Sequence, residues 1–589
     1  MCSILGYKGN NDAASILVEG LRLMEYRGYD SVGIAMLDDN KFTIRKGVGK
    51  VQEVNERFDL DKMVGKIGIG HTRWATHGGV TDKNAHPHPT CRQEIAVVHN
   101  GIISNYRELR QKLTERGHTF RSDTDSEVIA HLLEEGYVKG DDIKSILFRT
   151  CDDLEGSYAF VAAFHDGTIA AARWEEPLII GIADNEYFIS SDVLGFLKHT
   201  DKAVFLDNGD TAILSGDNEL EIFDSAGNPI SRPVTRVSWE LGLADKGIHA
   251  HYTLKEINEQ TATLFRAADV SNDSLRKFCE IISNAKNVYM TGSGSSYHAA
   301  LEAKHFFSKL ARVRADVIIS SEFSYESDAI QPGSVLIAIS QSGESADVLH
   351  SVKKAKESGC TILSIVNVST SSLARASEMY LELGCGPEIG VAATKSFTSQ
   401  VALLYTIASI LGGRENELVV KRGVLQEAVA KVLSKCDLVA DFARSIAKFN
   451  DIYLLGRALH YPIALEGALK LKELAYVHAE GLAAGELKHG PLALIDSNAI
   501  VIVLNPRDGT YVDTLSSLHE IKSRGATVIG ISNVRDDTYD YWIELPEAES
   551  NIYPLLEAIP LQMLSYYLAL QNKVNPDYPR NLAKSVTVR

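Results

Sequence analysis

The first residue of the chain that could do chemistry is Cys2, in the stretch Met1-Cys2-Ser3-Ile4-Leu5-Gly6-Tyr7. A small second residue favours removal of the initiator methionine, which would leave Cys2 with a thiol and a free α-amino group. An α-amino group titrates near ~7.7–8.0, so part of it is neutral at neutral pH and can activate the thiol as a base. The alternative is that Cys2 is only the first residue of a buried strand.

Polar clusters further along could serve such a nucleophile. Arg73, in the cluster His71-Thr-Arg-Trp-Ala-Thr-His77, could hold a carboxylate, and Asp125 could hold an ammonium. The two would then grip an α-amino acid by its backbone. Asn100 and the amide of Gly101 could donate to a developing oxyanion. Each has a simpler alternative: Arg73 in a surface ion pair, Asn100-Gly101 in a type I′ hairpin turn, and Asp125 as a helix cap.

Metal ligation has little support in the sequence. His77, His86 and His88 lie close together, but His86-Pro-His88-Pro lacks ligand spacing. The seven cysteines are scattered without a Cys-x-x-Cys pair, which argues against a zinc site and a disulfide framework. We therefore expect no metal and no other cofactor.

Two loops in the second half could bind a phosphate. The apolar run 287–291 leads through Gly292-Ser-Gly-Ser-Ser-Tyr297 into a helical pattern, and the run 334–339 leads through Ser340-Gln-Ser-Gly-Glu-Ser345 into another. Such loops offer unpaired N–H groups and the positive end of a helix dipole. A dinucleotide site is the alternative, although Tyr297 stands where its third glycine would be.

A third candidate group lies on a helical pattern at 462–473. Glu466, Lys470 and Glu473 are spaced so that they share one helical face, and His489 follows in the next loop. A carboxylate, a lysine and a histidine can move protons on a sugar phosphate. The alternative is a solvated stripe of ion pairs.

The helices and strands expected to carry these residues follow two patterns along the chain. Up to about residue 240, short apolar strands alternate with helical stretches, which predicts layered sheets with helices outside. After residue 276, strands alternate with longer helices, as in parallel βαβ units, and a similar layout returns at residue 451. The expected domains are 1–240, 277–420 and 440–579, with a linker at 241–276 and a tail at 580–589.

Composition limits the function. The 589 residues are too many for one core, and 45% hydrophobic with 23% charged residues is typical of globular protein. The net charge of -17 argues against a nucleic-acid partner. The apolar run 401–411 is too short to span a bilayer, and no signal peptide opens the chain. We expect a cytoplasmic protein without a membrane partner.

The first half resembles the class II glutamine amidotransferase domains of the N-terminal-nucleophile superfamily. The resemblance rests on Cys2, Tyr26-Arg-Gly-Tyr-Asp30, His71 to His77, Asn84-Ala-His-Pro-His88 and His99-Asn-Gly-Ile102. It implies an αββα sandwich in which Cys2 attacks the glutamine amide and Asn100 with Gly101 forms the oxyanion hole. The implied glutamine-binding residues are Arg73, Thr76, His77 and Asp125, and Trp74 would gate the ammonia route. Ser3 departs from the usual glycine after the nucleophile.

The second half resembles the tandem sugar-isomerase (SIS) domains of the glutamine:fructose-6-phosphate aminotransferase family. Matching segments include Leu465 to Glu473, Gly485 to Pro491 and the tail Pro579 to Val588. Ser293-Gly-Ser-Ser296 replaces the usual Cys-Gly-Thr-Ser but keeps the hydroxyls. The implied fold is an α/β multidomain chain, with two doubly wound SIS domains after the sandwich.

This resemblance implies glutamine and fructose 6-phosphate as substrates and glucosamine 6-phosphate as product. Lys584 would form a Schiff base, Glu473 would move a proton, and His489 would open the ring from the partner subunit of a homodimer. The tail would cover the sugar, with Arg580 at the mouth of the ammonia path. The implied sugar-phosphate residues are Ser295, Ser296, Ser340, Gln341, Ser342, Ser345, Val391 and Lys470.

Three other functions compete. A relative of the same architecture could act on another keto-sugar phosphate or on a nucleotide-linked sugar. A sugar-phosphate sensor built on isomerase domains would not need Cys2, Glu473, His489 or Lys584. A purine-pathway amidotransferase needs a phosphoribosyl-diphosphate loop, which the sequence does not contain.

Overall fold

The computed structural model describes residues 2–215, 219–237, 246–267, 269, 273–449 and 451–587, without the side chains of 417–422. The chain folds into two compact units. One comprises Met1–Gly242 with the tail Ser585–Arg589, and the other comprises Leu243–Lys584.

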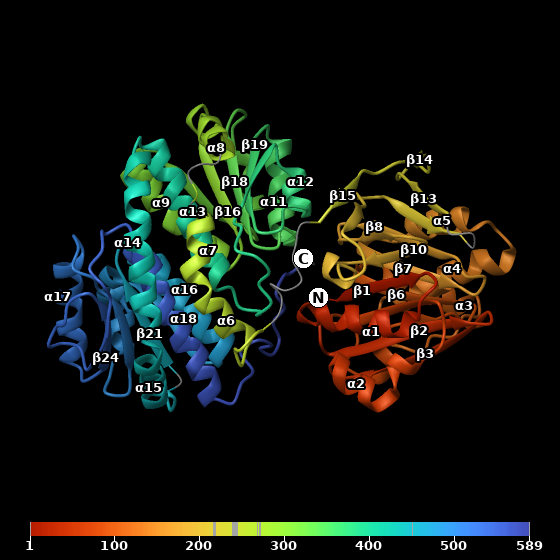
Figure 1. Ribbon diagram of the computed structural model, residues 1–589, viewed down its shortest axis with the longest axis horizontal. Coiled ribbons are helices and arrows are strands. Elements are labelled where there is room, and N and C mark those ends of the chain that lie inside the picture. Colours follow the sequence, from red (N-terminus) through yellow and green to blue (C-terminus); the bar gives the residue numbers. More distant parts are fainter. Residues whose placement is uncertain are drawn as a thin grey trace. The chain divides into compact units, whose positions relative to one another are not determined.

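The first unit is built on two antiparallel sheets (Figure 1). The larger described sheet has the strand order β15 (Val234–Arg236), β11 (Lys202–Phe205), β9 (Ile179–Ala183), β10 (Glu186–Ser190), β1 (Ser3–Lys8), β4 (Ile67–Arg73), β2 (Ser31–Asp38) and β3 (Lys41–Val48). The other has the order β14 (Pro229–Ile230), β13 (Leu220–Phe223), β12 (Thr211–Leu214), β8 (Ile169–Trp174), β7 (Gly156–Phe164), β6 (Ile95–Ile103) and β5 (His88–Pro89).

The two sheets pack face to face, and helices cover their outer faces. Alternate residues of β6 show this arrangement: Ala96 and Val98 join the core between the sheets, whereas Val97 joins the core beneath the helices. Helices α1 (Ala13–Leu23) and α2 (Val51–Phe58) accompany the first sheet. Helices α3 (Tyr106–Glu115), α4 (Glu127–Lys139) and α5 (Ile143–Asp153) cover the second. The result is the αββα sandwich that the resemblance implied.

The second unit contains two parallel sheets of the same topology. One has the order β17 (Ala315–Ile319), β16 (Val288–Gly292), β18 (Val335–Ser340), β19 (Thr361–Val366) and β20 (Met379–Glu382). The other has the order β22 (His478–Ala483), β21 (Asp451–Gly456), β23 (Ile500–Leu504), β24 (Thr527–Ser532) and β25 (Tyr541–Glu544). In each sheet the chain starts at the second strand, turns to the edge and then crosses to the third, so the two halves repeat one plan.

Helices bury both faces of each parallel sheet. The described helices are α6 (Tyr252–Asn258), α7 (Gln260–Ala267), α8 (Asp273–Ser283), α9 (Ser295–Phe306), α10 (Phe323–Glu326), α11 (Ala346–Glu357), α12 (Ser372–Ala376), α13 (Lys395–Leu411), α14 (Glu415–Leu433), α15 (Cys436–Ile446), α16 (His460–Ala475), α17 (Tyr511–Lys522) and α18 (Tyr553–Gln571). A single large apolar core lies between the two sheets and includes residues of α9, α13, α16 and α18. Helices α11 and α12 cover the outer face of the first sheet (Figure 1).

The predicted linker 241–276 contains α6, α7 and the start of α8, and residues 246–251 before α6 are not helical. Residues 241–245, 268 and 270–272 lie outside the described part, but Ile257 of α6 and Leu264 of α7 belong to the core of the second unit. The apolar run 401–411 lies in α13, which is buried in that core. None of the described helices has the length and apolar character needed to cross a membrane.

Candidate active sites

Cys2 lies directly before β1, and its thiol meets the backbone of Trp74. The Trp74 amide donates to Sγ at 3.2 Å, and the thiol is 3.5 Å from the Trp74 carbonyl oxygen. Burial raises the pKa of the Cys2 thiol, while the Trp74 amide and the Arg73 charge act in the opposite direction. The thiol therefore needs a base to become a nucleophile.

Asn100 lies within β6, so the hairpin-turn alternative is wrong. Its side-chain amide donates to the Cys2 carbonyl oxygen at 3.1 Å, and its Oδ1 lies 3.0 Å from Nε2 of His71. Burial lowers the pKa of His71 to about 3, so the imidazole is neutral and Nε2 can donate to Asn100 Oδ1. This contact orients the NH2 group of Asn100 towards Cys2, as an oxyanion donor requires.

Gly101 cannot be replaced by a residue with a side chain without distortion. Its φ is +115°, and a Cβ atom would lie 2.0 Å from the Ser157 carbonyl oxygen on β7. The glycine therefore lets β6 continue past Asn100 while keeping its own amide next to that residue.

Arg73 is 3% exposed, so the surface-ion-pair alternative is wrong. Its guanidinium donates to the carbonyl oxygens of Gly78 at 3.1 Å and Gly79 at 3.2 Å, and also to that of His77. These bonds curl the loop after β4 around the arginine. Thr76 is exposed on this loop, and the ring of His77 meets Tyr106 edge-on at 5.2 Å.

Asp125 does not cap the following helix, because Ser126 occupies the N-cap position of α4. Instead, Asp125 Oδ2 accepts a hydrogen bond from the Ile103 amide at 2.8 Å. The carboxylate is therefore fixed at the end of β6, the strand that carries Asn100.

Ser3 turns its side chain away from the thiol. Its hydroxyl donates to the Met24 carbonyl oxygen at 2.9 Å in the buried interior. Successive residues of a strand point to opposite faces, so the extra atoms relative to glycine do not lie beside Sγ.

Arg27 contacts Cys2 and is paired with Asp192, and the sequence did not predict either as a site residue. Arg27 Nε donates to the Cys2 carbonyl oxygen at 3.4 Å, and its guanidinium pairs with Asp192 at 3.3 Å. Asp192 also accepts from the Tyr26 hydroxyl at 2.6 Å. Arg27 belongs to the motif Tyr26-Arg-Gly-Tyr-Asp30, but no spacing in the sequence indicated Asp192.

A buried carboxyl joins the tail to the first unit. Glu176 accepts a hydrogen bond from the Thr587 hydroxyl at 2.7 Å. Burial raises the pKa of Glu176 to about 7, although the charges of Arg27 and Arg173 oppose the rise. No sequence signal marked Glu176, which follows β8 on the chain.

The two hydroxyl-rich loops of the second unit follow neighbouring strands. Gly292 ends β16, Ser340 ends β18, and the sheet reverses its strand order between them. Such a switch point opens a crevice at the carboxyl ends of the strands, where α/β proteins bind ligands. Both loops lead into helix N-termini, those of α9 and α11, as the sequence predicted.

The loop hydroxyls are held by local contacts. Ser296 accepts from the buried amide of Gln400 at 3.0 Å, and Ser340 accepts from the Gly343 amide at 3.0 Å. Ser342 accepts from the Glu344 amide at 3.2 Å, and the Ser340 and Ser345 hydroxyls are 3.4 Å apart. The Gln341 carbonyl oxygen accepts from the Asn367 amide at 3.0 Å.

Glu466, Lys470 and Glu473 lie on one face of α16. Lys470 Nζ is 3.3 Å from Glu466 and 2.5 Å from Glu473, and it donates to Ser295 at 3.1 Å. Because Glu466 and Lys470 are buried, a solvated stripe is wrong for these two residues. Glu466 also accepts from Ser295 at 2.8 Å, so α16 is joined to the first phosphate loop.

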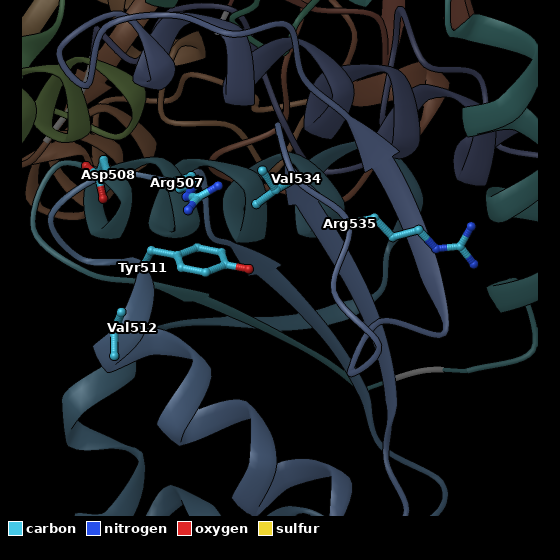
Figure 2. A pocket seen from close by; sticks show the side chains of 6 residues that line it. All are labelled: Arg507, Asp508, Tyr511, Val512, Val534 and Arg535. Carbon is cyan, nitrogen blue, oxygen red and sulfur yellow. The ribbon is translucent and has the colours of Figure 1, made fainter.

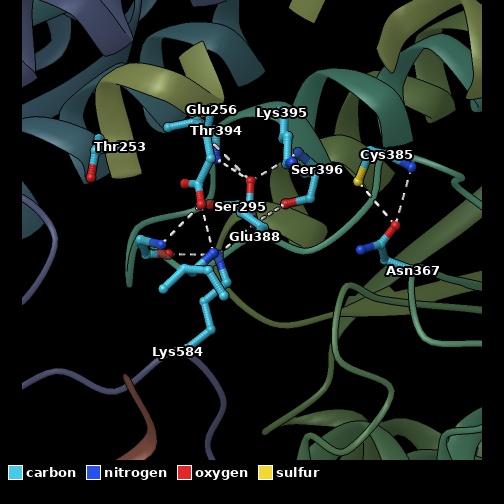
Figure 3. Close-up of polar contacts among 12 residues, drawn as sticks. Thr253, Glu256, Ser295, Asn367, Cys385, Glu388, Thr394, Lys395, Ser396 and Lys584 are labelled. Carbon is cyan, nitrogen blue, oxygen red and sulfur yellow. Dashed lines mark hydrogen bonds and ion pairs between the residues drawn. The ribbon is translucent and has the colours of Figure 1, made fainter. Parts of the chain in front are cut away.

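Lys584 enters a buried group of carboxylates (Figure 3). Its Nζ donates to Glu388 Oε2 at 2.5 Å and to the Gly390 carbonyl oxygen at 2.8 Å. Glu388 also accepts from the Ser396 hydroxyl and from the amides of Ser396 and Thr394. Burial alone would raise the pKa of Glu388, but the Lys584 charge and the hydrogen bonds from Ser396 lower it below its ordinary value.

Glu256 lies beside this group with fewer donors. Its Oε1 accepts from the amides of Ile389 and Gly390, while its Oε2 has no hydrogen-bond partner. Burial, and then the Glu388 charge, raises the pKa of Glu256. Lys584 therefore faces one ionised carboxylate and one carboxyl group that favours its proton.

The remaining predicted residues make other contacts with their side chains or backbone. Val391 is buried, and its amide donates to the Asp577 carbonyl oxygen at 3.2 Å. Arg580 stacks on Tyr476 at 4.4 Å, and His489 is exposed. In the first unit, the Trp74 ring meets Tyr29 edge-on at 5.7 Å.

The second parallel sheet carries a different set of side chains at its corresponding edge (Figure 2). A pocket of about 660 Å³ follows β23 and β24 and is lined by Arg507, Asp508, Tyr511, Val512, Val534 and Arg535. The Asp508 carboxylate pairs with the buried His460 imidazole, with Oδ2 and Nε2 3.2 Å apart. The serine loops of the first sheet are therefore not repeated at the residues that line this pocket.

Family models match both halves of the chain. A "Glutamine amidotransferase domain" matches residues 71–198, and an "SIS domain" matches residues 281–410 and 445–571. Among solved structures, the C-terminal domain of glucosamine-fructose-6-phosphate aminotransferase from Francisella tularensis is 34% identical, with a TM-score of 0.54. It covers 56% of this chain and 99% of that one.

Curated relatives match over the full length. Proteins named glutamine–fructose-6-phosphate aminotransferase (isomerizing) from Thermococcus kodakarensis and Methanothermobacter thermautotrophicus are 41% and 42% identical. In both comparisons 100% of each chain is covered. The chain therefore belongs to the glutamine–fructose-6-phosphate aminotransferase (isomerizing) family.

Proposed function

We propose that this chain transfers the amide nitrogen of glutamine to fructose 6-phosphate and isomerises the product to glucosamine 6-phosphate. The observation that carries the proposal is the presence, in one chain, of the Cys2–Asn100 contact and the buried Lys584–Glu388 pair. The first suits amide cleavage, and the second places an amine among proton acceptors. A sensor would need neither, and full-length similarity to enzymes of this name supports the proposal further.

In the glutamine half, the Cys2 sulfur attacks the side-chain amide carbon and releases ammonia. Asn100 and the Gly101 amide stabilise the oxyanion, and water then releases glutamate from the thioester. Arg73, Thr76, His77 and Asp125 form the glutamine site in this proposal. The bonds from Arg73 to its own loop support a role in shaping that site.

In the sugar half, the phosphate binds at Ser295, Ser296, Ser340, Gln341, Ser342 and Ser345, with Val391 and Lys470 nearby. Lys584 Nζ condenses with the C2 carbonyl of the open-chain sugar and loses water. Ammonia displaces the lysine, and Glu473 takes a proton from C1 and returns it to C2. Before it attacks, Lys584 must leave its bonds to Glu388 and Gly390.

Several parts of the proposal concern assembly. We propose a homodimer in which His489 of one chain opens the sugar ring that is bound by the other chain. We also propose that the protein works in the cytoplasm. Trp74 and Arg580 are the proposed gates for ammonia, and the tail 580–589 is the proposed cover of the sugar. The proposed domain limits are 1–240, 277–420 and 440–579, with a linker at 241–276.

Mass spectrometry of the product tests the proposal directly. The purified chain, with removal of Met1 verified, receives fructose 6-phosphate, glutamine labelled with heavy nitrogen in the amide, and unlabelled ammonium. We expect labelled glucosamine 6-phosphate, because ammonia passes to the sugar before it mixes with the solution. Glutamate without amino sugar would refute the sugar assignment, and the assay would then be repeated with other keto-sugar phosphates.

Two variants separate the half-reactions. Cys2→Ala should lose glutamine cleavage and retain sugar binding, whereas Lys584→Ala should cleave glutamine but form little amino sugar. Cys151→Ala is the matched control, because this half-buried thiol lies on α5 outside the site. Equal loss of both half-reactions in either variant would contradict the assigned roles.

A further inference from the structure

A second group of reactive side chains lies in the first unit, outside the glutamine site. It consists of Cys91 after β5, His118 after α3, and His131 with Glu134 on α4. One potential ligand atom from each residue lies within 4.8 Å of all the others. His131 and Glu134 are buried, and Cys91 and His118 are half-buried. These side chains come from three segments that the sequence does not place together.

We propose that this group binds a zinc ion that fixes the three segments to one another. A thiolate, two imidazoles and a carboxylate are the ligand types that zinc prefers, whereas magnesium and calcium prefer oxygen ligands alone. Four protein ligands leave no open position, so the site is structural and takes no part in catalysis. The proposal departs from the expectation of no metal, which rested on the histidines at 77, 86 and 88 and on the lack of a Cys-x-x-Cys pair among the scattered cysteines.

The spacing of the ligand atoms fits a tetrahedron. Zinc–ligand bonds of about 2.3 Å to sulfur and about 2.1 Å to nitrogen or oxygen give ligand separations of roughly 3.6 Å for S···N and 3.4 Å for N···O. The Cys91 sulfur lies 3.8 Å from Nδ1 of His118 and 3.7 Å from Nδ1 of His131. Glu134 Oε2 lies 3.0 Å and 3.2 Å from the same two nitrogens.

The surroundings also suit a bound metal. The Thr119 amide donates to the Cys91 sulfur at 3.3 Å, which stabilises a thiolate. The far nitrogen of each imidazole faces a second carboxylate, His118 towards Glu135 and His131 towards Glu127, both at 3.7 Å. Carboxylates behind metal-bound histidines orient the rings and raise their basicity.

The proposed site is connected to the glutamine half through Glu127. Besides facing His131, this carboxylate accepts from the amides of Arg121 and Ser122 and from the Ser122 hydroxyl. Those bonds shape the loop that ends at Asp125, the proposed partner of the glutamine ammonium. A metal that orders α4 and the Cys91 loop would therefore hold that loop in place.

The first test uses the full-length chain and needs no enzyme activity. After expression with added zinc and dialysis, elemental analysis should find one zinc per chain, and X-ray absorption should show one sulfur neighbour per zinc. Metal-free protein titrated with cobalt(II) should show the visible bands of a tetrahedral site and a thiolate-to-cobalt charge-transfer band. A chain that binds neither ion tightly would overturn the proposal and leave a metal-free network of His118, His131 and Glu134.

Substitutions test which residues bind the metal. Cys91→Ser should abolish the charge-transfer band, whereas Cys151→Ser, the matched thiol control in the same unit, should retain it. Glu135→Gln should weaken zinc binding by about 10-fold, because it acts only through His118. If Cys91→Ser fails to fold, the sulfur count of the unmodified chain still decides. Zinc that remains in a folded Cys91→Ser variant would place the metal elsewhere.

The outcome is independent of the proposed reaction. If the chain binds zinc but does not make amino sugar, the zinc site is supported and the proposed function is refuted. If both stand, metal removal should raise the KM for glutamine, because Asp125 loses support, and should leave binding of fructose 6-phosphate unchanged.

Discussion

The carboxylates around Lys584 give a prediction in which two chemically identical changes have different results. Glu388→Gln removes the partner of a buried ammonium, since the side chains of Lys584 and Glu388 are 4% and 0% exposed. Glu256→Gln instead replaces a carboxyl group whose pKa is already raised by burial and by the Glu388 charge. A glutamine there resembles the protonated acid in shape and charge.

The expected costs differ because a buried charge without a partner is expensive. Removing one partner of a buried ion pair costs about 3–5 kcal/mol. Glu388 also accepts from Ser396 and Thr394, so the substitution replaces a carboxylate by an amide whose NH2 group faces donors. The Glu256 substitution keeps an acceptor for the Ile389 amide and should cost about 1 kcal/mol or less.

The dependence on pH has opposite signs for the two groups. Because the pKa of Glu388 is lowered in the fold, its stabilisation is present above the ordinary carboxyl pKa and disappears as pH falls through the folded value. Because the pKa of Glu256 is raised, the unfolded chain loses this proton first, so stability declines as pH rises from the ordinary value towards the folded one. Glu256→Gln should remove that decline.

Hydrogen exchange of the full-length chain, read by mass spectrometry in peptides covering residues 388–396, measures these changes. A loss of about 3 kcal/mol in local opening corresponds to roughly 100-fold faster exchange, expected for Glu388→Gln. Glu256→Gln should change exchange by less than about 5-fold. Equal acceleration in the two variants, or none in Glu388→Gln, would refute the assignment of the charge to Glu388.

Three further outcomes follow from single contacts. Gly101→Ala should abolish glutamine hydrolysis, because its Cβ would lie 2.0 Å from the Ser157 carbonyl oxygen; retained hydrolysis would contradict a fixed β6. Ser3→Gly should cost about 1 kcal/mol of stability in thermal unfolding by losing the bond to Met24, yet leave glutamine kcat/KM unchanged, and a large rise in kcat/KM would mean that Ser3 hinders the thiol. His460 is fully buried; burial alone would lower its pKa, but Glu557 and Asp508 raise it to about 10. The protection factors of the α16 amides, which correct for the intrinsic rise of exchange with pH, should therefore fall as pH rises from about 6.5 to about 10. His460→Gln should flatten that pH profile.

Features that depend on local sequence pattern could be predicted without the structure. Short apolar runs broken by helical stretches predicted the layered sheets of the first half, and apolar runs followed by glycine and hydroxyl loops predicted the parallel units. Helical spacing put Glu466, Lys470 and Glu473 on one face of α16, as the contacts of Lys470 confirm. Short motifs such as His71 to His77 were enough to indicate the family. The chemistry of a site requires particular side chains at fixed short spacings, and such spacings are visible in the sequence.

The tertiary structure was needed for features that depend on contacts between distant segments. It placed Asn100 inside a strand, turned Ser3 towards Met24, and brought Arg27, paired with Asp192, against the Cys2 carbonyl oxygen. It also gave Lys584 two unequal carboxyl neighbours and assembled the ligand group around Cys91 from three segments. Burial and charge at a residue depend on which chain segments surround it in space, and local spacing in the sequence does not contain that information.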